Sequence, residues 1–101
     1  MIIDLQFEWD EAKRLANLRK HGLNFAEVGS AFIDPDGIIY TVLRNGLGEE
    51  RHVIIGKVGH RVVHIVFTMR GELIRLISAR QAHVKERSLY ERGKNRPSSV
   101  H

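Results

Sequence analysis

From Ile38 onward the chain has a pattern typical of a β-sheet, in which four segments rich in β-branched residues are separated by short turn sequences. The expected strands cover residues 38–44, 51–58, 61–69 and 73–79. The sequences between them are Asn45-Gly46, Gly59-His60 and Arg70-Gly71-Glu72, all compatible with hairpin turns. The last three of these strands carry apolar residues on both faces, which predicts a sheet packed on both sides.

The residues before Ile38 predict one strand and two helices. Residues 2–8 alternate as a strand does, and a helix is expected between an N-cap at Asp10 and a C-cap at Gly22. Apolar residues recur along it with helical spacing: Ala12, Leu15, Ala16 and Leu18. A second, short helix is expected from a capping box formed by Asn24 and Glu27, through Val28, Ala31 and Phe32, to a turn at residues 34–37.

A last helix is expected at residues 82–92, so the order is strand, two helices, four antiparallel strands and a helix. This order indicates a single α+β domain over residues 1–101, with helices packed on one sheet and a flexible tail at 93–101. The chain contains no cysteine, which excludes disulfides and thiolate metal sites. Its start does not resemble a signal peptide and no apolar stretch has the length of a membrane helix, so we expect a cytoplasmic protein without a membrane partner.

Charge is distributed unevenly along the chain. Residues 1–50 carry 9 acidic and 5 basic side chains, whereas residues 51–101 carry 3 acidic and 11 basic ones. A strongly basic half is typical of proteins that bind phosphate backbones. A solvated basic surface is the simpler alternative.

The six histidines do not predict a metal site. His60 and His64 would be about 13 Å apart on one strand, which is too far to share an ion. His64, within an apolar strand, is expected to be a hydrogen-bonded core histidine. We therefore expect no metal and no cofactor.

Four polar residues lie along one side of the first helix: Lys13, Asn17, Lys20 and His21. Cleaving RNA without a metal requires groups that transfer protons and cations around the phosphate. His21 exchanges protons near neutral pH, and Lys20 suits a charge clamp or a proton carrier. A solvent-exposed polar face would have the same spacing.

Arginines accompany the expected strands. Arg75 interrupts the apolar face of Leu73, Ile77 and Ala79, whereas Arg80 is expected on the opposite face with Ile74, Leu76 and Ser78. A guanidinium holds phosphate bidentately, although surface ion pairs with Glu49, Glu50 or Glu72 would also explain these arginines. Tyr90, in the last helix, could stack on a base or pack against the sheet.

Short motifs in a fixed order run from Phe7 to Glu91. They are Phe7-Glu8-Trp9-Asp10, Lys13, Asn17, Lys20-His21-Gly22, Phe25, Phe32, Asp34-Pro35, Glu50-Arg51, Ile55-Gly56, Phe67-Thr68, Arg70, Ile77-Ser78-Ala79-Arg80, Glu86-Arg87 and Tyr90-Glu91. In these motifs the chain resembles the BrnT toxin family. The resemblance implies a RelE-like fold and a metal-independent endoribonuclease that inhibits translation and growth. It also implies neutralisation by a BrnA-like ribbon-helix-helix antitoxin, and a complex that binds operator DNA through the antitoxin and represses its own operon.

Carried over motif by motif, the resemblance gives Lys20, His21, the Glu50-Arg51 pair and Arg80 as candidate active residues, and the other site residues come from the patterns described above. The expected catalytic residues are Lys20, His21, Arg51 and Arg80. The expected substrate-binding residues are Lys13, Asn17, Glu50, Arg70, Arg75 and Tyr90. Our mechanism assigns phosphate binding to Arg51 and Arg80 and proton transfer to Lys20 or His21, which requires these four residues to converge.

One segment departs from the family pattern. Similar members often have a longer loop containing His-Ser before the Glu-Glu-Arg element, whereas this chain has residues 43–48, with Asn45 near the position of the histidine. If that histidine is catalytic in relatives, we expect lower activity here. A noncatalytic nucleic-acid-binding module and a protein-interaction module are the alternative functions.

Overall fold

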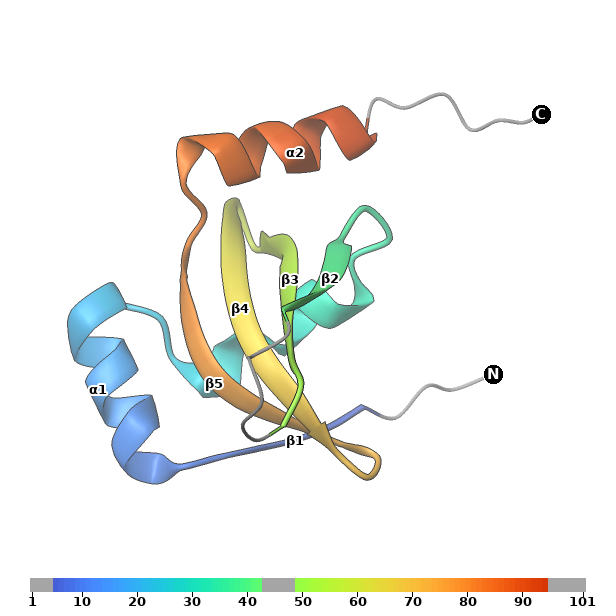
Figure 1. The fold of residues 1–101 in the computed structure, drawn as a ribbon. Helices are drawn as coiled ribbons and strands as arrows, with labels where there is room; N and C mark the ends of the chain where they lie inside the picture. The colour runs from blue at the N-terminus through green and yellow to red at the C-terminus, as the bar shows by residue number, and fades with distance from the viewer. Residues whose placement is uncertain (1–4, 43–48, 95–101) are drawn as a thin grey trace.

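The predicted α+β class is confirmed in the computed structural model, which describes residues 5–42 and 49–94 (Figure 1). The elements are β1 Gln6–Trp9, α1 Glu11–His21, the 3-10 helices η1 Phe25–Glu27 and η2 Gly29–Ile33, β2 Ile38–Val42, β3 Arg51–Val58, β4 Arg61–Arg70, β5 Leu73–Gln81 and α2 Val84–Lys94. None of the helices in these residues has the length and apolar character needed to cross a membrane. The expected turn at Asn45-Gly46, the altered loop at 43–48 and the end of the chain from residue 95 lie outside the described residues.

The described strands form one mixed sheet in the order β1-β5-β4-β3-β2. Neighbours from β2 to β5 are antiparallel, and β1 pairs in parallel with β5, with Gln6 opposite Leu73 and Trp9 opposite Leu76. The turns after β3 and β4 use left-handed glycines, Gly59 at φ 62° and Gly71 at φ 60°. The sheet therefore joins the first strand of the chain directly to the last.

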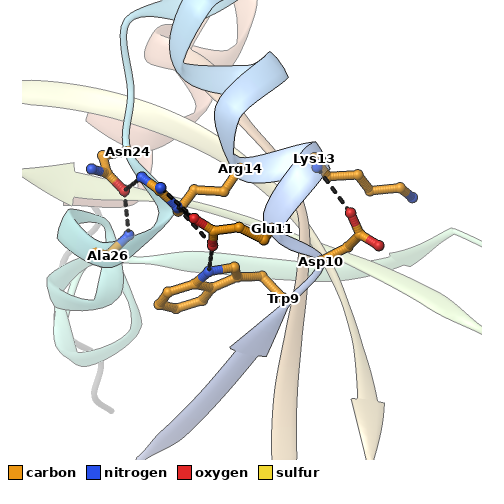
Figure 2. Close-up of polar contacts among 7 residues, drawn as sticks. All are labelled: Trp9, Asp10, Glu11, Lys13, Arg14, Asn24 and Ala26. Carbon is orange, nitrogen blue, oxygen red and sulfur yellow. Dashed lines mark hydrogen bonds and ion pairs between the residues drawn. The ribbon is translucent and has the colours of Figure 1, made fainter.

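Both predicted caps of α1 are present. The Asp10 carboxylate accepts a hydrogen bond from the Lys13 N–H at 3.0 Å, and Gly22 ends the helix at φ 71°. Figure 2 shows the polar contacts around this first turn: the Trp9 indole N–H donates to Glu11, and Arg14 pairs with Glu11 and reaches Asn24. These contacts tie the end of β1 to α1 and to the start of η1.

The single short helix expected after α1 is instead two 3-10 helices. They are separated at Val28, whose backbone (φ −98°, ψ 1°) leaves the helical region. Asn24 does cap η1, but its side chain accepts from the N–H of Ala26, two residues on, and not through a capping box with Glu27. The Glu27 N–H, which a capping box would bond to the Asn24 side chain, donates instead to the Asn24 carbonyl at 2.8 Å.

The sheet is packed on both faces, as its apolar strands predicted. The larger cluster lies on the side of η1 and η2 and contains Leu23, Phe25, Val28, Ala31, Ile54, Val63, Ile65, Phe67, Ile74, Leu76 and Ala79. The smaller cluster lies on the side of α2 and contains Val53, Ile55, Val62, Ala82 and Tyr90, with Ile38 and Val66 packed against it. In Figure 1, α2 crosses one end of the sheet and α1 lies beside β5.

The side of α1 that faces the sheet is not the side predicted from the spacing of its apolar residues. Leu15 and Leu18 are 42% and 37% exposed, whereas Asn17 is buried at 7%. The polar side of the helix faces β5 because the Asn17 amide bonds the backbone of Ala79 and Leu23. Two hydrogen bonds to the edge of the sheet and one to the loop after α1 have outweighed the burial of two leucines.

The face of Arg80 also differs from the prediction. Val66 pairs with Ser78 but Phe67 pairs with Leu76, so Ile77 is an extra residue in β5. This bulge reverses the alternation beyond it, because one residue on the bulged strand has no partner. Ala79 consequently joins Ile74 and Leu76 in the core, and Arg80 lies on the same face as Arg75.

Candidate functional site

The side of the sheet that faces α2, which we call the α2 face, carries its charged side chains in cross-strand rows. The row nearest α2 consists of Ile38, Ile55, His64 and Arg80, and the middle row consists of Tyr40, Val53, Val66 and Ser78. The far row contains the partners Val42 and Arg51, and then Thr68, Arg75 and Glu8. Since side chains alternate along a strand, residues two apart share a face, and adjacent rows are about 7 Å apart.

Arg80 is held by Glu86 in the first turn of α2. Two parallel hydrogen bonds join Arg80 Nη1 and Nη2 to the two Glu86 oxygens at 2.8 and 2.9 Å, and Nη1 also donates to the Gln81 carbonyl. Glu86 in turn accepts from the His83 N–H at 2.7 Å, at the start of α2. The Arg80 hydrogen bonds lower the pKa of Glu86 to about 2 and raise the pKa of Arg80. Of its five N–H donors, Arg80 keeps two for another ligand.

His64 lies beside this ion pair. Its side chain is the cross-strand neighbour of Arg80, and its Nε2 is 3.7 Å from a Glu86 oxygen. Burial, and secondarily the Arg80 charge, lower the His64 pKa and so favour the neutral imidazole. His64 is buried as predicted, but its Nδ1 has no hydrogen-bond partner among the described residues, contrary to the expectation of a fully bonded core histidine.

The far row holds a second group of charges. Arg75 donates to Glu8 at 3.2 Å, and Arg70 lies within 4 Å of both Glu8 and Glu49. The partner that Arg75 was expected to require is thus Glu8 of β1. Glu50 is exposed, and its carbonyl accepts from the Thr68 hydroxyl at 2.7 Å.

Arg51 is half-buried in the far row, and within the described part of the chain its side chain forms no hydrogen bond or ion pair. It lies two strands from Arg80, about 10 Å across the sheet, and four residues, about 13 Å, along it. The two guanidinium groups therefore do not lie against one another.

A groove of about 270 Å³ lies between α1 and the outer edge of β5. It is lined by Lys13, Ala16, Asn17, Lys20, His21, Ile77 and Ser78. Four predicted site residues are thus brought together, although the Asn17 amide is committed to the backbone of Leu23 and Ala79. Ser78 lines the groove and also belongs to the middle row, so the groove adjoins the α2 face there.

Tyr90 is 1% exposed, and its hydroxyl donates to Asp34 at 2.7 Å. Two roles were considered for Tyr90, stacking on a base and packing against the sheet, and the structure shows packing. Desolvation and this bond raise the pKa of Tyr90. Burial of Asp34 acts to raise the pKa of its carboxyl. The hydrogen bonds from Tyr90 and from the N–H groups of Asp36 and Lys57 outweigh this effect and lower that pKa.

Sequence reasoning missed two polar residues as possible contributors to the site: Tyr40 on the α2 face and Glu86 in α2 itself. A glutamate three residues into a helix was the available signal for Glu86. Nothing in the sequence distinguished Tyr40 from an ordinary strand residue.

A larger hollow, of about 660 Å³, runs along the outer side of α2, away from the Arg80–Glu86 pair and from the charges of the far row. Within residues 5–42 and 49–94, no three His, Asp or Glu side chains gather closely enough to hold a metal ion.

Comparison with known proteins adds one finding. The profile of the family described as "Ribonuclease toxin, BrnT, of type II toxin-antitoxin system" matches residues 9–86. The match begins at the last residue of β1 and ends at Glu86, so it includes the groove and all three rows except Glu8. No curated protein matches the chain significantly.

Proposed function

The chain belongs to the BrnT family of ribonuclease toxins of type II toxin–antitoxin systems, and we propose that it is a metal-independent endoribonuclease that inhibits translation and growth. The observation that carries the proposal is the presence of Arg51, Arg75 and Arg80 on one face of the sheet. Guanidinium groups bind phosphates through paired hydrogen bonds. These arginines lie between the groove beside α1 and the edge strand β2. This arrangement suits the binding of a single strand of RNA across a RelE-like fold.

The proposed reaction uses the RNA's own nucleophile. The 2′-oxygen forms a bond to the adjacent phosphorus, the bond from phosphorus to the 5′-oxygen breaks, and a 2′,3′-cyclic phosphate and a 5′-hydroxyl result. One group must take the 2′ proton and another must protonate the leaving oxygen. We assign proton transfer to Lys20 or His21, which line the groove next to Ser78.

Arg80 would stabilise the charge of the phosphorane, because two of its donors remain free while Glu86 fixes its orientation. The separation of Arg51 from Arg80 indicates that Arg51 contacts a different phosphate. Lys13, Glu50, Arg70 and Arg75 would line the path of the strand. The bonds of Asn17 and Tyr90 favour structural roles for these two, in place of direct substrate contact.

Membership of a type II system implies a protein antitoxin and an RNA substrate. We propose that the antitoxin is BrnA-like, with a ribbon-helix-helix part through which the complex binds operator DNA and represses its own operon. A gene for such a protein beside the gene for this chain, and a stable complex on co-expression, are the expected results. Failure of the co-expressed pair to bind the DNA upstream of the two genes would contradict the operon proposal.

The ribonuclease proposal is tested with the purified chain and end-labelled single-stranded RNA in EDTA. We expect cleavage, with a 2′,3′-cyclic phosphate on the upstream product. Arg80→Lys keeps a cation beside Glu86 but loses the planar fork, so we expect cleavage at least tenfold slower. Arg61→Lys is the matched control, because Arg61 is exposed and precedes Val62, which faces α2, so it points to the other side of the sheet.

Three results would contradict parts of this proposal. RNA that stays intact with and without Mg²⁺, and no growth arrest in cells, would exclude a ribonuclease and favour a binding module. Cleavage that requires Mg²⁺ would exclude metal independence. Unchanged cleavage by Arg80→Lys would exclude the role given to Arg80.

A further inference from the structure

The two tyrosines of the described chain lie in opposite environments. Tyr90 is buried and hydrogen-bonded, whereas Tyr40, in the edge strand β2, is 41% exposed, and its hydroxyl has no hydrogen-bond partner among the described residues. Tyr40 pairs with Val53, which faces α2, so its ring is on the α2 face. An exposed aromatic ring on the same face as the arginines is not explained by core packing.

The neighbours of Tyr40 form a strip with an apolar centre. Its row continues through Val53 and Val66 to Ser78, where the groove of Lys20 begins. Arg51 lies in the row on one side and Arg80 in the row on the other, each about 7 Å along the strands from the middle row. Across the sheet, Arg51 is one strand from Tyr40, whereas Arg80 is three strands away, about 14 Å.

This arrangement matches the two parts of a nucleotide. Aromatic side chains stack on the faces of unpaired bases, and adjacent cations bind the phosphates on either side. A base within a duplex has both faces covered by its neighbours and is not available for such stacking. We propose that Tyr40 is a stacking platform for one unpaired base of the RNA, next to the phosphate held by Arg51. The proposal rests on the proposed function for its substrate, and it adds a residue that determines how the substrate binds.

Binding to an uncleavable probe tests the stacking separately from catalysis. The probe is a 2′-O-methyl oligoribonucleotide in which one base is 2-aminopurine, whose fluorescence is quenched by stacking. With the wild-type protein we expect quenching on binding. Tyr40→Phe keeps the ring and should behave like the wild type. Tyr40→Thr fits an edge strand but removes the ring, and should abolish the quenching and weaken binding about tenfold.

Ile39→Thr is the matched control. Ile39 neighbours Tyr40 and is 61% exposed, but it pairs with Ile54 and so lies on the opposite face. We expect no change in quenching or affinity. Thermal melting of each variant establishes that it is folded.

A second measurement uses the wild-type protein only, so it does not depend on the folding of a variant. An oligonucleotide carrying 5-iodouridine at each position in turn is irradiated in the complex, and the cross-linked peptide is sequenced. A cross-link at Tyr40 is expected. Tyr40→Thr that quenches and binds like the wild type, or cross-links confined to other residues, would overturn the proposal.

The two proposals can fail separately. A wild-type protein that quenches the probe but cuts no natural RNA would leave the stacking role and remove the ribonuclease. A Tyr40→Thr variant that cuts RNA at the wild-type rate and still quenches the probe would remove the stacking role and leave the ribonuclease.

Discussion

The Asn17 side chain bonds both backbone groups of Ala79, donating to its carbonyl at 2.8 Å and accepting from its N–H at 3.0 Å. The pairing of β1 with β5 ends at Trp9 and Leu76, so Ala79 lies beyond the reach of the parallel strand. One amide side chain thereby takes the place of a strand residue at the exposed edge. It also fixes the distance between α1 and β5, across which the groove lies.

Asn17→Ala should therefore destabilise the protein by about 2–4 kcal/mol, because it leaves the backbone groups of Ala79 and Leu23 without partners. Urea unfolding followed by circular dichroism measures the change. Arg19→Ala, an exposed position on the same helix, should change stability by less than about 0.5 kcal/mol. Equal effects of the two substitutions would contradict the edge role of Asn17.

The Arg80–Glu86 pair predicts a particular pH dependence. The pKa of Glu86 is about 2 in the folded protein against 4.5 unperturbed, so its ionised form favours folding. The contribution is complete above about pH 4.5 and is lost as the pH falls from there toward 2. Solvent screening limits it to about 1–2 kcal/mol.

Glu86→Gln lacks this titration. The stability difference between the wild type and Glu86→Gln should be largest at pH 6 and should shrink steadily toward pH 2, as measured by chemical denaturation at each pH. A difference that stays constant over this range would show that the Glu86 carboxylate gains nothing from Arg80.

Gly56 of β3 lies directly against Ala31 of η2. A Cβ added there would lie 2.8 Å from the Ala31 carbonyl oxygen, a backbone atom that cannot rotate away. Gly56→Ala should cost about 1–3 kcal/mol through forced separation of η2 from the sheet. Thermal melting checks this, with Ser30→Ala, at an exposed position of η2, as the control that should melt like the wild type.

Arg51 provides a test based on salt. If it binds one phosphate, Arg51→Ala should reduce the slope of log affinity against log salt for single-stranded RNA by about 0.7. Fluorescence anisotropy from 50 to 300 mM KCl measures the slope, and Arg61→Ala, on the other face, should leave it unchanged. An altered affinity at every salt concentration with the same slope would mean that Arg51 acts through the fold and not on a phosphate.

Local signals in the sequence predicted most of the elements, but not the division of the short helix into η1 and η2. Asp10 and Gly22 cap α1 as expected because capping depends on two or three neighbouring residues, and the β-branched segments form the strands they predicted. β5 ends two residues later than predicted, and α2 both begins and ends two residues later. Which side of each element faces the core was harder to predict. Leu15 and Leu18 point outward because Asn17 meets a residue 62 positions away, and helical spacing carries no information about such a partner.

The candidate site shows the same division. Lys13, Lys20 and His21 share a groove because their helical spacing placed them on one side of α1, as predicted. The expected convergence with Arg51 did not follow, because the register of the sheet sets that distance. Arg80 changed face because of one extra residue, Ile77, and Tyr40 gained significance only from the arginine rows beside it.

The parallel pairing of β1 with β5 has a consequence for the order in which the protein becomes active during its own synthesis. Residues 6–9 leave the ribosome before residues 73–76 and must wait for them before they can join the sheet. The groove likewise needs both α1 and Ser78, which are more than 50 residues apart in the chain. A nascent chain whose β5 is still inside the ribosome therefore has neither a finished sheet nor an assembled groove, so the ribosome that makes this protein carries no complete site until β5 has emerged.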